Sequence, residues 1–127
     1  MTKITGVRTV AVPVADQDRA LAFYGEALGF ETRMDAPIGP DFRWIEVAPP
    51  GAPTSIALVP ASEATPAGTD TGIRLSTGDA AGDHAALLAQ RVDVDAEVMV
   101  TDYAPPMFTF RDPDGNQLVV VEDMPGI

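Results

Sequence analysis

Hydrophobic and polar positions alternate at the start of the chain and then change to a helical spacing. Val10, Val12 and Val14 recur at every second position, which is the period of a half-buried strand. Asp16 and Asp18 follow and supply the oxygen acceptors that favour a helix N-terminus. The elements predicted for the first half are a strand over 7–14, a helix over 19–28, and strands over 30–34, 43–47 and 55–59.

The second half repeats this βαβββ order. Its predicted elements are a strand over 72–77, a helix over 80–90, and strands over 95–101, 107–111 and 117–122, with a turn over 112–116. Val10 and Ile45 have counterparts at Ile73 and Phe108, each 63 positions further along the chain. A half of about 60 residues is marginal alone. We therefore expect one α+β domain over 1–127, built from tandem modules at about 5–60 and 71–123 with a linker at about 61–70.

Two motifs resemble the vicinal oxygen chelate superfamily, which includes glyoxalase I, bleomycin-resistance proteins and extradiol dioxygenases. The first runs from Val10 to Glu31 and contains Phe23-Tyr24 and Leu28-Gly29-Phe30; the second is Phe110-Arg111-Asp112-Pro113-Asp114-Gly115-Asn116. The resemblance implies two curved mixed sheets around a cleft, with the helices on the outer faces. It also implies a small organic ligand or substrate and a homodimer, with the modules paired within one chain or between two.

The metal enzymes of this family hold a divalent ion with His, Glu or Gln at four inward positions. Carried onto this chain, those positions fall on Thr9, Ala57, Gly72 and Val119. Three of these side chains have no donor atom, and a lone hydroxyl is a poor ligand. The sequence therefore predicts no metal and no cofactor. The only histidine, His84, lies early in the second helix, where we interpret it as a solvated helix residue in preference to a base or a ligand.

The composition excludes several partners. The chain has 127 residues with 8 basic and 19 acidic side chains, a net charge of −11, which disfavours nucleic acid and anionic membranes. There is no cysteine, so disulfides and thiolate chemistry are excluded. No apolar run approaches the roughly 20 residues of a membrane span, and the first residues lack a cleavage site of the secretory type. We expect a cytoplasmic protein.

Strand alternation also predicts which side chains line the cleft, because successive residues point to opposite faces. Trp44 offers an aromatic platform for a flat ligand, or fills the sheet interior or a dimer contact. Glu46 and Arg74 either clamp a polar ligand or pair with each other. The predicted ligand-binding residues are Trp44, Glu46, Arg74, Met107, Thr109, Gln117 and Val119.

These features favour metal-independent binding of a small organic molecule, of the glyoxalase and bleomycin-resistance type, without chemistry. The alternative is a lyase or isomerase of the glyoxalase type with an unusual site, in which Glu46 acts as the base. A regulatory or partner-binding domain is a third hypothesis. No catalytic residue is assigned.

Overall fold

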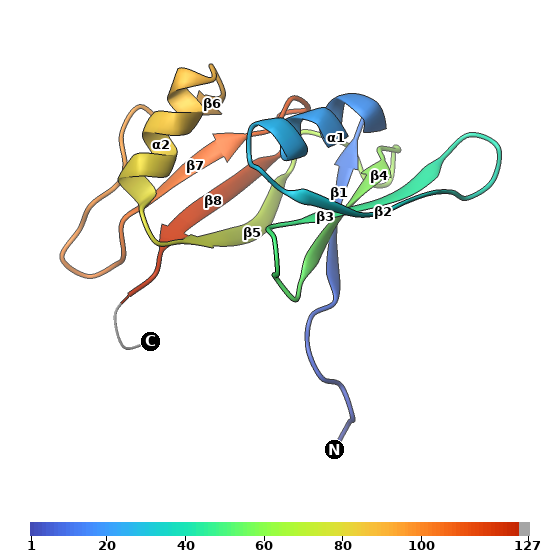
Figure 1. Ribbon diagram of the computed structural model, residues 1–127, viewed down its shortest axis with the longest axis horizontal. Coiled ribbons are helices and arrows are strands. Elements are labelled where there is room, and N and C mark those ends of the chain that lie inside the picture. The colour runs from blue at the N-terminus through green and yellow to red at the C-terminus, as the bar shows by residue number, and fades with distance from the viewer. Residues whose placement is uncertain (125–127) are drawn as a thin grey trace. The chain divides into compact units, whose positions relative to one another are not determined.

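The computed structural model describes residues 1–124, in two compact units that divide between Ala67 and Gly68. Among these residues, each unit contains a four-stranded sheet and one helix (Figure 1). Neither helix has the length and apolar character needed to cross a lipid bilayer. The elements of the first unit are β1 (Thr9–Val14), α1 (Gln17–Glu26), β2 (Glu31–Pro37), β3 (Arg43–Ala48) and β4 (Ser55–Pro60).

The first sheet has the strand order β1-β4-β3-β2, in which β1 and β4 are parallel and the other neighbours antiparallel. Helix α1 packs against β3 and β4. Between helix and sheet lies an apolar core of fully buried side chains, and burial of this kind is the main favourable term in folding. Its members include Val12, Val14, Tyr24, Ile45, Val47 and Leu58.

Helix α1 begins where the N-cap chemistry of the sequence indicates. The Asp16 carboxylate accepts a hydrogen bond from the Arg19 N–H at 3.0 Å, which satisfies one of the unpaired donors of the first turn. The helix starts at Gln17, two residues before the predicted start. The Gln17 amide donates to the carbonyl oxygens of Arg43 and Leu58 at 2.7 and 2.9 Å, so it ties the first turn to β3 and β4.

The second unit repeats the topology of the first. Its elements are β5 (Asp70–Thr77), α2 (Ala80–Ala89), β6 (Asp93–Val94), β7 (Met107–Arg111) and β8 (Gln117–Glu122). The strand order β5-β8-β7-β6 contains a parallel β5–β8 pair beside antiparallel neighbours, as in the first unit. Helix α2 packs on β6, β7 and β8 over the buried Phe108, Phe110 and Leu118. The predicted tandem βαβββ modules of an α+β fold are therefore confirmed.

The strand predicted over 95–101 is wrong. In the structure, β6 covers only Asp93–Val94, and Met99 forms an isolated bridge with Met107. The Asp95 carboxylate explains the difference, because its Oδ2 accepts the Thr109 N–H at 3.1 Å, a donor that a continuing ladder would use. Its Oδ1 lies 3.1 Å from the Arg111 guanidinium. A side chain thus replaces the backbone partner and ends the strand.

The predicted turn between the last two strands is confirmed over 112–116. Its buried Asn116 accepts the N–H groups of Gly68 and Thr69 at 2.9 and 3.1 Å and donates to the Asp112 carboxylate at 3.0 Å. Gly115 has a φ of 81°, which only glycine adopts without strain. The turn therefore fastens the first residues of the second unit to the end of its own sheet.

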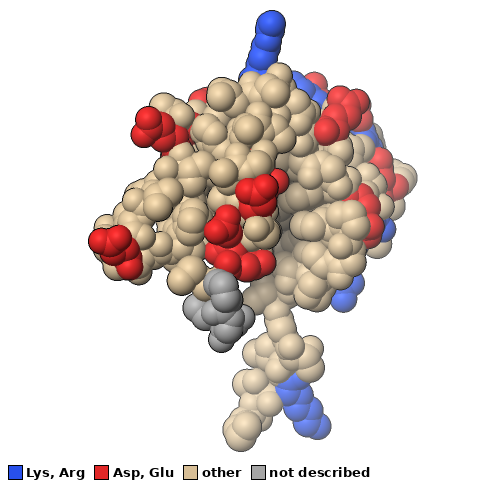
Figure 2. Space-filling view, turned by 60° about the vertical axis from the view of Figure 1, so that its left-hand side comes forward, with Lys and Arg blue, Asp and Glu red and all other residues tan. Residues whose placement is uncertain are grey.

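The negative charge is distributed over the surface. Figure 2 shows acidic side chains in several separate groups on the visible face, with few basic ones among them. Such a distribution is typical of a solvated acidic surface. The net charge therefore does not locate a binding site, and such a site has to be identified from individual side chains.

Candidate functional site

A polar cluster lies on the face of the first sheet opposite helix α1, and Glu46 is at its centre. The Ser55 hydroxyl donates to Glu46 Oε1 at 2.6 Å, and the Trp44 indole N–H donates to Oε2 at 2.7 Å. Trp44 and Glu46 are two residues apart on β3 and therefore point to the same side. Both carboxylate oxygens consequently have a protein donor.

The cluster extends across the sheet to β1. The Thr9 hydroxyl lies 3.0 Å from Ser55 Oγ and donates to the Ser55 carbonyl oxygen at 3.2 Å. The Ser55 hydroxyl has a single hydrogen, and its shortest contact is with the Glu46 carboxylate, which is a stronger acceptor than the Thr9 hydroxyl. Ser55 therefore donates to Glu46. Parallel pairing of β1 with β4 sets Thr9 directly opposite Ser55. We call Thr9, Trp44, Glu46 and Ser55 the Glu46 cluster.

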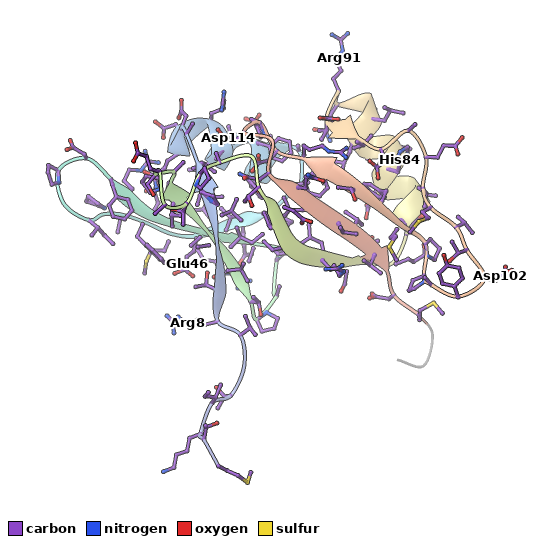
Figure 3. All side chains as sticks on the ribbon, turned by 180° about the vertical axis from the view of Figure 1, so that it is seen from behind. Arg8, Glu46, His84, Arg91, Asp102 and Asp114 are labelled. Atoms are coloured by element: carbon purple, nitrogen blue, oxygen red, sulfur yellow. The ribbon has the colours of Figure 1, made fainter. Side chains whose placement is uncertain are left out.

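The environment of Glu46 stabilises its charged form. Hydrogen bonds from Ser55 and then from Trp44 lower the pKa of this carboxyl below its ordinary value, and the charges of Arg8 and Arg33 act in the same direction. Partial burial opposes the shift but does not reverse it. Figure 3 labels Arg8 and Glu46 in the same part of the first unit. Glu46 is therefore a carboxylate at neutral pH.

The alternation predicted for β3 agrees with the burial pattern of this strand. Ile45 and Val47 are fully buried beneath the helix, whereas Trp44 and Glu46 are half-buried on the other face. The structure brings these two predicted ligand-binding residues into direct contact. It also adds Ser55, which the same rule would have found, because Ser55 is two residues before the inward position Ala57.

The five predicted residues of the second unit lie on β5, β7 and β8. In the second sheet, Val119 of β8 is paired with Thr109 of β7 on one side and with Arg74 of β5 on the other. Met107, Thr109, Gln117 and Val119 are half-buried and alternate with fully buried residues of the core. Arg74 is exposed, and its guanidinium donates to the Gly72 carbonyl oxygen at 3.2 Å.

The four positions that the resemblance equates with metal ligands do not supply a donor set. Ala57 is fully buried, and Gly72 has a φ of 73° in the segment where the pairing of β5 with β8 shifts register. Only Thr9 carries a side-chain oxygen, and this oxygen already contacts Ser55. Within residues 1–124, no group of three or more His, Asp or Glu side chains is arranged to hold a metal ion. These four residues therefore offer a single side-chain oxygen.

His84 is part of the packing between α2 and its sheet. One ring nitrogen, Nε2, lies 2.7 Å from the Asp95 carbonyl oxygen, and the ring meets Phe108 edge to face at 5.2 Å between centroids. The sequence interpretation of a solvated helix residue is incomplete, since the side chain is only half-exposed.

Comparison with known proteins places this fold in context. Residues 6–120 match the family described as the Glyoxalase/Bleomycin resistance protein/Dioxygenase superfamily. The crystal structure of TnmS3, an antibiotic binding protein from Streptomyces sp. CB03234, has a TM-score of 0.86 to this fold, and its sequence is 36% identical. The match covers 98% of this chain and 100% of TnmS3. A member of the same superfamily from Sphaerobacter thermophilus DSM 20745 is 35% identical, covers 96% and 100%, and has a TM-score of 0.87.

Two curated proteins from Bacillus subtilis (strain 168) match shorter segments. YetH is 46% identical over 57 residues, 45% of this chain and 48% of YetH, and YurT is 54% identical over 37 residues, 29% of this chain and 28% of YurT. The matches thus span about half or less of these relatives, both of which are uncharacterised. The family match extends over nearly the whole chain and agrees with the tandem modules of the structure. The chain belongs to the Glyoxalase/Bleomycin resistance protein/Dioxygenase superfamily.

Proposed function

We propose that this protein binds a small organic molecule without a metal ion, and that the open face of the first sheet carrying Trp44 forms a principal part of the site. The observation that supports this proposal most directly is the Glu46 cluster, in which a half-buried indole is hydrogen-bonded to an ionised carboxylate. Ligand sites commonly combine apolar or aromatic surface with a few placed polar groups. The likeness to TnmS3, described as an antibiotic binding protein, supports the same class of function.

The state of Glu46 favours binding over catalysis. A carboxyl that works as a general base near neutral pH has a raised pKa and lies within hydrogen-bond reach of the proton that it takes. Glu46 has a lowered pKa, and its two oxygens already accept hydrogen bonds from Ser55 and Trp44. The alternative of a lyase or isomerase with Glu46 as the base therefore has no support in the geometry of this cluster.

The remaining parts of the proposal concern the second unit and the assembly. The half-buried face of β7 and β8 offers apolar surface from Met107 and Val119 and polar groups from Thr109 and Gln117, with Arg74 on β5. In the proposal, these residues of the second unit also take part in ligand binding. A homodimer in the cytoplasm is part of the same proposal.

Calorimetric titration tests the proposal. The probes are metal-free bleomycin and a panel of aromatic antibiotics, added to protein treated with EDTA and passed over a desalting column. We expect at least one probe to bind, Trp44→Ala to weaken its binding about ten-fold or more, and the probe to be recovered unchanged. Leu88→Ala, which shortens an exposed apolar side chain on α2, is the control and leaves affinity unchanged.

Three results would contradict specific parts of this proposal. Unchanged affinity in Trp44→Ala would remove the indole from the site. Stoichiometric transition metal in freshly purified protein, with binding lost after EDTA treatment, would overturn metal independence. Conversion of the probe at a rate abolished by Glu46→Gln would replace the binder by an enzyme.

A further inference from the structure

Trp44 is the only tryptophan of the chain, and its ring nitrogen has a single strong partner in the structure, Glu46 Oε2 at 2.7 Å. We infer that Glu46 is a positioning residue, whose carboxylate holds the Trp44 indole in one orientation on the open face of β3 before any ligand arrives. The role of this orientation in ligand binding rests on the proposed function. The positioning itself is a property of the free protein.

The residues paired with Trp44 and Glu46 across the sheet are small. The residue directly opposite on the neighbouring strand β2 is Ala36, and Ala57 of β4 is opposite Glu46. Methyl side chains at these register positions present little surface against which an indole can wedge. A half-buried aromatic side chain with small cross-strand neighbours retains more than one staggered χ1 position and a broad χ2, so a directional hydrogen bond favours one orientation.

Glu46 is itself held from the opposite side. Its Oε1 accepts from Ser55, a residue only 4% exposed, and Ser55 Oγ lies 3.0 Å from the Thr9 hydroxyl. The contacts thus run without interruption from β1 through β4 to β3 and end at the indole. Each strand of this path is fixed by backbone pairing to the next. The paired strands therefore set the position of the carboxylate, and the carboxylate sets the position of the ring.

The charge state of the carboxylate suits this role. The ionised form accepts the indole N–H and the Ser55 hydroxyl at the same time, whereas a protonated carboxyl would have to use one oxygen as a donor. The charges of Arg8 and Arg33 help to keep Glu46 ionised. A side chain ordered before binding loses less conformational freedom when a ligand arrives, which corresponds to about two- to ten-fold in Kd.

Nuclear magnetic resonance of the free protein tests the positioning directly. The indole N–H of Trp44 gives one distinct ¹⁵N–¹H signal, since no second tryptophan exists. We expect slow hydrogen exchange of this proton in the natural chain, at least about ten-fold faster exchange in Glu46→Ala, and partial recovery in Glu46→Gln, whose amide oxygen still accepts a hydrogen bond. The backbone amide spectrum of each variant shows that it is folded.

Ser55→Ala supplies an independent variant if Glu46→Ala fails to fold. It leaves the carboxylate in place but removes its support, so the exchange of the indole proton should become faster by a smaller factor. Ser62→Ala, at an exposed turn with only a local partner, is the matched control. Indole exchange as slow in folded Glu46→Ala as in the natural chain would overturn the inference.

A second measurement separates this inference from the proposed function. With the tightest-binding probe of the antibiotic panel, Glu46→Ala should raise Kd about two- to ten-fold, and Glu46→Gln should raise it less. If the indole is released but Kd for the probe is unchanged, the positioning role fails while the binding function stands. If the indole is held in the natural chain but no probe binds, the proposed function fails while the hydrogen-bonded positioning stands.

Discussion

The Gln17 side chain on α1 and the Arg43 backbone on β3 form two hydrogen bonds with each other. The Gln17 amide nitrogen donates to the Arg43 carbonyl oxygen at 2.7 Å, and the Arg43 N–H donates back to the amide oxygen at 3.3 Å. The same amide nitrogen also donates to the Leu58 carbonyl oxygen at 2.9 Å. One glutamine thus satisfies the backbone of two strands and fixes the start of the helix above them.

Gln17→Glu should therefore destabilise the fold although the two side chains have nearly the same shape. The new carboxylate has no hydrogen to donate, so the carbonyl oxygens of Arg43 and Leu58 would face a negative charge. We expect a loss of about 2–4 kcal/mol in the free energy of unfolding at pH 7, measured by urea denaturation. The loss should be smaller at pH 4, where a protonated carboxyl supplies one donor. Gln90→Glu is the control: this exposed residue at the C-cap of α2 donates to the Ala86 carbonyl oxygen at 3.4 Å, so we expect a smaller loss, below about 1 kcal/mol.

Removal of the Ser55 hydroxyl should weaken the first unit through Glu46. Ser55→Ala deletes a 2.6 Å hydrogen bond to a charged, half-buried acceptor. Hydrogen bonds to charged groups contribute about 1.5–3 kcal/mol, and we expect a loss in this range by urea denaturation. Ser62→Ala should change the free energy of unfolding by less than about 0.5 kcal/mol. Equal effects of the two substitutions would show that the Ser55–Glu46 contact does not contribute to stability.

The lowered pKa of Glu46 predicts a contribution to stability that depends on pH. A carboxyl whose pKa is lower in the folded than in the unfolded state contributes stability above the ordinary value of 4.5, and that contribution is lost as the pH falls through the folded-state pKa. The chain has 18 other acidic residues, so the informative quantity is the difference in unfolding free energy between the natural chain and Glu46→Gln. This difference should shrink as the pH falls below about 4.5. A difference that stays constant from pH 7 to pH 3 would contradict the prediction.

Asn116 should be among the most sensitive positions of the second unit. Asn116→Ala removes the acceptor of the Gly68 and Thr69 N–H groups and the donor to Asp112. Asn116 is fully buried and Asp112 is 4% exposed, so we expect a loss of about 2–4 kcal/mol. Hydrogen exchange at the amides of Gly68 and Thr69 should become faster than in the natural chain. Asp102→Ala, on the exposed loop side chain labelled in Figure 3, should change neither quantity.

The sequence predicts the framework well because the framework depends on local patterns. Alternation of Ile45 and Val47 with Trp44 and Glu46 specifies which side of β3 enters the core. Asp16, placed before an apolar helical stripe, specifies a helix N-terminus to within two residues. The correspondence of the two halves follows from repeated spacing, which predicts the βαβββ order that both units share.

The contacts that define the cluster depend on register between strands, which no local pattern contains. Ser55 meets Glu46 because β3 and β4 pair with Glu46 opposite Ala57, and a shift of one residue would separate them. Asp95 begins a predicted strand because local alternation does not reveal a distant partner for its carboxylate. In the structure, this carboxylate takes the Thr109 N–H, an interaction between residues 14 positions apart.

The duplication allows residues at matched positions of the two modules to be compared. With the spacing of 63 that relates the two halves, Trp44 corresponds to Met107 and Glu46 to Thr109. Two sheets of the same strand order therefore carry different residues at matched positions, one pair aromatic and ionised, the other flexible and neutral. The same strand order accommodates both pairs, so the chemical difference between the sheets at these positions comes from the side chains alone. Grafting the first pair onto the second sheet would still leave the carboxylate without its full hydroxyl support, because Gly72 stands at the position that corresponds to Thr9.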